Sequence, residues 1–125
     1  MRKLEIGILV GFSMVLVVGS SLADGTGTKV EGYVIDSSCA FVKNLKKPIS
    51  PDCAARCAKA GSPLVILTES GTIYWPISGA MPAKGQNSRL MEFAGKRIMA
   101  TGQVYSKGGS RAIVIENIEK APAGN

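Results

Sequence analysis

Short runs of hydrophobic and β-branched residues, separated by glycine, proline and serine, predict that this chain folds mainly as β-strands. Five such runs occupy residues 29–36, 64–68, 72–75, 96–105 and 111–116. In the first run, Val30 and Val34 fall on one face and Glu31 and Tyr33 on the other, which is the alternation of a strand with one buried side. A Ser-Gly pair links the second run to the third, and a Gly-Gly pair links the last two, so both connections predict hairpins.

Two short helices are expected between these strands. Residues 50–52 (Ser-Pro-Asp) combine a side-chain cap, a proline for the first helical position and an acidic residue for the first turn, and Gly61 ends the segment. These signals predict a helix that carries two of the three cysteines. The second helix is expected at 89–94, capped by Asn87 or Ser88 and ended by a glycine.

The first 23 residues have the organisation of a secretory signal peptide. Arg2 and Lys3 precede an apolar run at 6–18, and residues 21–23 (Ser-Leu-Ala) suit cleavage. An uncleaved membrane anchor is the alternative, although glycines and serines interrupt the apolar stretch. We expect a bacterial protein that is periplasmic or secreted, with no transmembrane segment after cleavage. Its expected parts are a signal peptide at 1–23, a flexible leader at 24–28, one domain at 29–120 with a cysteine-bearing insertion at 37–62, and a disordered tail at 121–125.

The order of the expected elements is strand, helix-bearing insertion, strand, strand, helix, strand, strand. This order resembles the OB-fold, a mainly β fold in which five strands form a Greek-key barrel and a short helix lies between the third and fourth strands. The resemblance covers residues 29–119 and is closest in 95–104 (GKRIMATGQV) and 113–118 (IVIENI), which look like the last two strands of small secreted bacterial OB-fold proteins. The chain also resembles a set of uncharacterised secreted bacterial proteins with an Asp-x-x-Cys strand end and a Cys-x-x-x-Cys helix. These resemblances imply a fold and export, and no catalytic residue.

The composition narrows the chemistry that this protein can perform. The 125 residues include no histidine, which excludes Ser-His-Asp and Cys-His catalysis and haem attachment through Cys-x-x-Cys-His. Any catalysis would have to use cysteine, carboxylate, lysine or tyrosine side chains. The sequence therefore favours a binding protein over an enzyme.

All three cysteines lie in the insertion between the first two strands. Cys53 and Cys57 are four residues apart, so on a helix they share one face and both sulfur atoms can point at Cys39 in the loop that leaves the first strand. A disulfide between Cys53 and Cys57 themselves is unfavourable, because parallel Cβ vectors on consecutive turns do not give the required dihedral angle. Any chemistry of this protein is thus expected to lie in the insertion.

Three interpretations of the cysteines remain open. The first is a structural disulfide from Cys39 to Cys53 or Cys57, worth about 3 kcal/mol, with a leftover thiol that could link a disulfide-bonded homodimer. The second is a soft metal ion held by the three thiolates, with Cu(I) preferred because a closed zinc site would lack its fourth ligand. The third is a thiol–disulfide relay, although the Cys-x-x-Cys spacing is absent.

Positive charge is concentrated in the same insertion. Five basic residues stand there against one acidic residue, and they are the candidates for binding an anionic ligand or surface: Lys43, Lys46, Lys47, Arg56 and Lys59. A solvated loop is the alternative explanation of this charge. The basic surroundings and the helix N-terminus together predict that Cys53 has the lowest thiol pKa of the three.

Two other candidates have simpler structural explanations. Asp36 could be a catalytic carboxylate, but an Asx-type turn that ends the first strand explains it equally. Tyr74, Trp75 and Tyr105 could form a stacking platform, but Trp75 also fits the core. We therefore expect an exported OB-fold binding module whose basic cysteine loop is stapled by a disulfide. A Cu(I) carrier or a thiol-redox element is the alternative.

Overall fold

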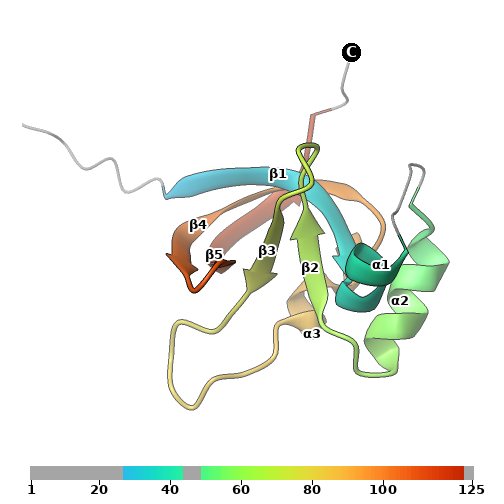
Figure 1. Ribbon diagram of the computed structural model, residues 1–125, viewed down its shortest axis with the longest axis horizontal. Coiled ribbons are helices and arrows are strands. Elements are labelled where there is room, and N and C mark those ends of the chain that lie inside the picture. The colour runs from blue at the N-terminus through green and yellow to red at the C-terminus, as the bar shows by residue number, and fades with distance from the viewer. Residues whose placement is uncertain (1–26, 44–48, 123–125) are drawn as a thin grey trace, which may run out of the picture.

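Five strands close into a single barrel in the order β1-β2-β3-β5-β4, as Figure 1 shows. The computed structural model describes residues 27–43 and 49–122. The strands are β1 (Thr28–Asp36), β2 (Leu64–Leu67), β3 (Ile73–Pro76), β4 (Arg97–Lys107) and β5 (Ser110–Lys120). All neighbouring strands are antiparallel except β3 and β5, which pair in parallel. The predicted fold class is confirmed: a mainly β protein with short helices and a closed five-stranded barrel, consistent with an OB-like fold.

The β4–β5 hairpin is longer than the sequence pattern predicts. Its pairs run from Lys107 opposite Ser110 to Ile98 opposite Lys120. A register shift next to Gly102 leaves Glu116 without an opposite residue in β4, and this bulge breaks the alternation at the position where the fifth run was expected to end. Beyond the bulge, β5 continues to Lys120, which lies opposite Ile98 near the start of β4.

Helix α2 (Pro51–Lys59) confirms the first predicted helix. The Ser50 side chain accepts a hydrogen bond from the Cys53 backbone N–H, 3.3 Å away, and Gly61 follows the helix with φ of +103°. The second predicted helix is divided into α3 (Asn87–Leu90) and a 3₁₀ turn, η1 (Met91–Phe93). The cap of the second helix was predicted wrongly: Gln86 is its N-cap, without a side-chain hydrogen bond, and Asn87 lies inside α3, where its Oδ1 accepts from the Leu64 backbone N–H at 2.8 Å.

Helix α1 (Ser37–Val42) was not predicted, since the sequence placed this segment in a loop. It begins directly after β1 because the Asp36 carboxylate caps it, with Oδ2 accepting from the Cys39 backbone N–H at 3.1 Å. Only one of its side chains is buried, that of Cys39. The helix is thus held by its cap, by the buried Cys39 and by the contacts of Ala40 and Phe41 with the outer face of the sheet, without a long apolar stripe.

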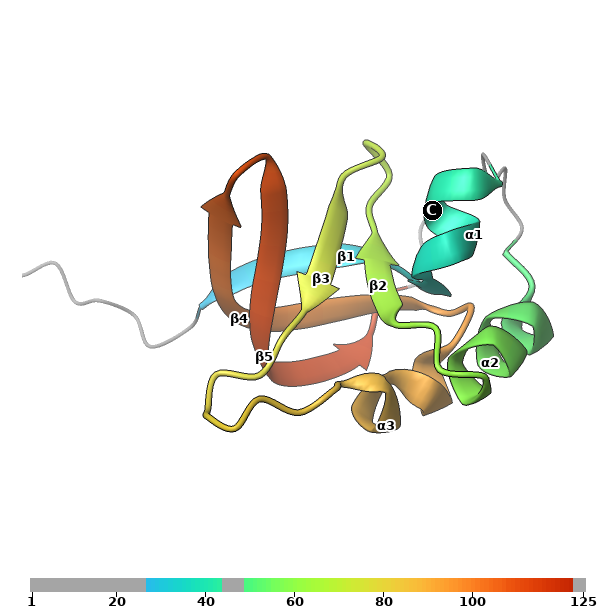
Figure 2. The same cartoon turned by 60° about the horizontal axis from the view of Figure 1, so that its bottom comes forward.

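The hydrophobic residues form two clusters on opposite faces of β1 and β2. Paired residues alternate between them, because Val34 opposite Ile66 points into the barrel and Ile35 opposite Val65 points outward. The outer cluster also includes Cys39. Figures 1 and 2 both show α1 and α2 together at one end of the barrel, beside the ends of β1 and β2.

Several sequence predictions concern residues that the structure does not describe. The signal peptide, most of the leader, Lys46 and Lys47 all fall outside the described ranges. Within 27–43 and 49–122, no helix combines the length and apolar character needed to cross a membrane. Export and cleavage therefore stay predictions.

Candidate thiol centre

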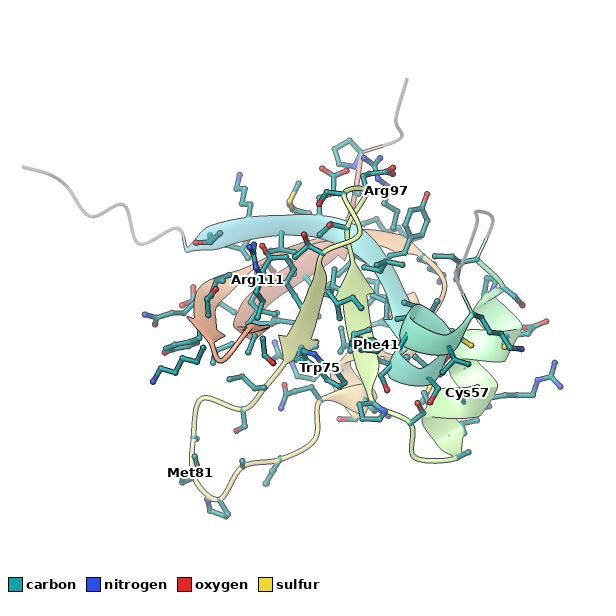
Figure 3. The ribbon with its side chains drawn as sticks, in the orientation of Figure 1. Phe41, Cys57, Trp75, Met81, Arg97 and Arg111 are labelled. Carbon is teal, nitrogen blue, oxygen red and sulfur yellow. The ribbon has the colours of Figure 1, made fainter. Side chains whose placement is uncertain are left out.

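The three cysteine sulfur atoms converge between α1 and α2. All three Sγ atoms lie within 4.8 Å of one another, and we call Cys39, Cys53 and Cys57 the thiol centre. Cys39 comes from α1, and the other two come from successive turns of α2; Figure 3 marks Cys57 on α2 beside α1. The prediction that Cys53 and Cys57 share a face turned toward Cys39 is therefore confirmed.

Local contacts explain why the two helices present their cysteines to each other. Asp36 caps α1 and Ser50 caps α2, and in each case the bonded N–H belongs to a cysteine of the centre. At the first residue of α2, Gly95 (φ of +73°) lies so close to Pro51 that a Cβ at Gly95 would come within 2.5 Å of the proline Cα. The start of α2 is thus packed against the loop that leads into β4.

No disulfide is formed within the centre. All three residues are free cysteines, so the predicted bond from Cys39 to Cys53 or Cys57 is not present in this structure. The Cys39 side chain is only 8% exposed, whereas those of Cys53 and Cys57 are half-buried. The centre therefore has a closed side at Cys39 and an accessible side at α2.

A buried carboxylate belongs to the same neighbourhood. Asp36 is 0% exposed and is the one charged or polar residue that is buried among the described residues. Its Oδ2 accepts from the Cys39 backbone N–H and from the Ser62 hydroxyl, at 3.1 and 3.3 Å. Its Oδ1 has no hydrogen-bond partner. From the sequence, Asp36 is interpreted as a turn residue. The signal that could have linked it to the thiol centre is the Asp-x-x-Cys spacing, because a cap residue bonds to the backbone N–H of the third helical residue, which here is Cys39.

This carboxylate disfavours the thiolate form of its neighbours. The pKa of Cys39 is raised from 9.0 to about 12, first by a hydrogen bond between its thiol and the Asp36 carboxylate and then by burial. Desolvation raises the pKa of Cys57, and the negative charge of Asp36 adds to this effect. In the metal-free protein, both thiols are therefore protonated at neutral pH. The predicted low pKa of Cys53 stays a prediction.

The three basic candidates that the structure describes lie at helix ends. Lys43 follows the last turn of α1, and Arg56 and Lys59 are exposed in the last turn of α2. Cations at this end of a helix interact favourably with its dipole, which gives them a structural role in α2. Binding of an anionic ligand by these residues stays a prediction.

The predicted aromatic platform is not assembled. Tyr74 packs against the barrel core and Trp75 against the outer cluster, so the two rings lie on opposite faces of β3. Trp75 instead stacks on Phe41, with 6.1 Å between ring centroids, and Phe41 is 64% exposed. A shallow cavity of about 380 Å³ includes Tyr105 but none of the cysteines.

The thiol centre is therefore the described cluster with the clearest chemistry. It combines three sulfur atoms, an unpartnered carboxylate oxygen and an accessible side. No family model matches this chain, and neither a curated protein nor a solved structure does.

Proposed function

We propose that this protein binds one thiophilic metal ion at the thiol centre. The observation that supports this proposal is the mutual approach of the three Sγ atoms to within 4.8 Å. Ligands about 2.3 Å from a shared ion in a trigonal arrangement lie about 4 Å apart. Small side-chain rotations would therefore bring all three sulfur atoms into one coordination shell.

The ligand types define the class of ion. Thiolates select soft or borderline ions such as Cu(I) and zinc, and the chain has no histidine to add. Cu(I) is the ion that three thiolates satisfy without further ligands. The half-buried Cys53 and Cys57 give such an ion a route in and out, which suits a carrier.

A single disulfide staple accounts less well for the arrangement. A staple needs two sulfur atoms at bonding distance and places no requirement on a third. Here a third cysteine, supplied by the same helix face, lies equally within the cluster. Metal binding uses all three residues, and for this reason we prefer it to the stapled binding module.

Anaerobic titration of the reduced protein with Cu(I), against a chromophoric chelator, tests this proposal. We expect one ion per chain, and we expect Cys39→Ser, Cys53→Ser and Cys57→Ser each to weaken binding at least about tenfold. Met81→Leu is the matched control, because Met81 is 87% exposed and carries a sulfur atom outside the centre. Wild-type affinity in all three cysteine variants would refute the proposal.

A further inference from the structure

The register of the barrel places a small residue between two aromatic residues on its outer face. Ala112 in β5 lies opposite Trp75 of β3 on one side and opposite Tyr105 of β4 on the other. Residues that are paired across neighbouring strands project from the same face of a sheet. Trp75 packs in the outer cluster, so Ala112 and Tyr105 also project outward. The surface over Ala112 is therefore lower than the surface on either side of it.

The cavity of about 380 Å³ lies over this small residue. Trp75 does not line it, since its ring stacks on Phe41 of α1, as Figure 3 shows. Tyr105 from β4 and Ile77 from the loop after β3 line the cavity on either side of Ala112, and they are 43% and 39% exposed. The volume is within the range of small-molecule sites, about 300–1,000 Å³.

The two ends of the cavity differ in chemistry. At one end, the loop after β3 lies against β5, because a Cβ at Gly79 would come within 2.9 Å of Val114 Cγ1. At the other end, Lys107 and Ser110 face each other across the β4–β5 hairpin, and both line the cavity. Among the described residues, none that lines the cavity is acidic, and none forms an ion pair with Lys107. The cavity thus has an apolar middle and one positively charged end.

We propose that this cavity binds a small molecule with one flat apolar ring system and one anionic group, which is the chemistry of an aromatic carboxylate. The strands on either side of β5 are about 10 Å apart, so a single flat ring fits over Ala112 and packs against Tyr105. The Lys107 ammonium and the Ser110 hydroxyl can both donate hydrogen bonds to a carboxylate at the hairpin end. No cysteine lines the cavity, so this proposal does not depend on metal binding.

Nuclear magnetic resonance titration of the ¹⁵N-labelled full chain with naphthoate tests the proposal. We expect the largest shifts at the amides of Tyr105, Ala112 and Val114. Naphthamide has the same ring system without the charge and should bind about tenfold more weakly. Octanoate has the charge without a ring and should bind at least about fivefold more weakly.

Three variants test the roles of individual residues. Ala112→Leu fills the cavity from its floor and should weaken naphthoate binding at least about tenfold, and Tyr105→Ala should weaken it about fivefold. Lys107→Gln should weaken it about tenfold, to the affinity of naphthamide. Lys120→Gln is the matched control, because Lys120 is exposed at the other end of β5, and its affinity should be unchanged. Both Ala112 and Tyr105 lie outside the barrel core, and the amide spectrum reports whether each variant keeps the fold.

Each contrary result overturns the proposal. Absence of shifts at these three amides with millimolar naphthoate would show that the cavity is not a site for this class of ligand. Equal affinities for naphthoate and naphthamide, or wild-type affinity in Lys107→Gln, would exclude recognition of the anionic group. Octanoate binding as tight as that of naphthoate would exclude recognition of a flat ring. Wild-type affinity in both Ala112→Leu and Tyr105→Ala would place the binding site elsewhere.

Discussion

Asp36 and Cys39 act as a pair because the cap of α1 joins them. The carboxylate accepts from the Cys39 backbone N–H at 3.1 Å, and its hydrogen bond with the Cys39 side chain, together with burial, raises the pKa of that thiol to about 12. The same contact thus fixes the helix and keeps the thiol protonated in the absence of metal. Two pH dependences follow from this pair.

The first concerns metal binding. The thiols of Cys39 and Cys57 are protonated at neutral pH, and a metal ion binds thiolates, so binding must release protons. Apparent affinity should therefore rise with pH, by at least about two powers of ten per pH unit between pH 6 and 8, one for each proton that Cys39 and Cys57 release. Chelator competition at several pH values measures how steeply the affinity rises with pH. Cys57→Ser should reduce this slope by about one power of ten per pH unit, because one proton fewer is released. An affinity independent of pH would show that the thiols are already ionised.

The second concerns the stability of the metal-free protein. The pKa of Cys39 is about 12 in the folded state against an ordinary value of 9.0, so folding favours the protonated thiol. This contribution is complete below pH 9 and is lost as pH rises from 9 toward 12. Urea midpoints should fall over this range, and they should fall less steeply in Cys39→Ala. The comparison uses the change of the urea midpoint with pH, because other groups that titrate at alkaline pH affect this slope equally in both proteins and the cavity left by Cys39→Ala does not titrate. Equal slopes in the wild type and in Cys39→Ala would contradict the raised pKa of Cys39.

At the scale of elements, the position of α2 depends on the loop before β4. Gly95 has φ of +73°, and a Cβ there would approach the Pro51 Cα to 2.5 Å. The contact leaves no room for any other residue at this position. It couples the barrel to the helix that carries Cys53 and Cys57 of the thiol centre.

Gly95→Ala should therefore destabilise the protein by at least about 2 kcal/mol and weaken metal binding. Gly85→Ala is the matched control, because nothing lies within 4 Å of a Cβ at Gly85, and its effect should stay within about 0.5 kcal/mol. Chemical denaturation and metal titration of both variants provide the measurement. Equal stability of the two variants would contradict the packing of α2 described above.

The sequence predicted elements where local signals are strong and missed contacts that only the closed barrel creates. Helix α2 could be predicted because its caps and its cysteine spacing are local. Helix α1 could not, since it has six residues and leaves Phe41 and Val42 exposed. The burial of Asp36 depends on Ser62, which is 26 residues away, so no local pattern indicates it.

At the scale of the whole molecule, export would place the thiol centre in an oxidising compartment. The signal-peptide pattern predicts a mature N-terminus at Asp24, four residues before β1 begins at Thr28. Intact mass of the exported protein should correspond to residues 24–125. A full-length mass in the membrane fraction would show that the segment is an anchor.

In such a compartment, metal binding and disulfide formation compete for the same sulfur atoms. The metal-loaded form should resist oxidation, because its thiolates are coordinated. The metal-free form should oxidise to one bond between Cys39 and a cysteine of α2, leaving one free thiol. Peptide mapping of both forms after exposure to air measures the difference, and equal oxidation would contradict a shared coordination shell.

The proposed metal centre requires that three cysteines together hold one metal ion. It is tested most directly by counting free thiols and bound metal in the same sample of protein isolated under reducing, anaerobic conditions. We expect about one metal ion per chain, with three thiols that become reactive toward an alkylating reagent only after a chelator removes the ion. One free thiol, one disulfide and no metal would contradict it.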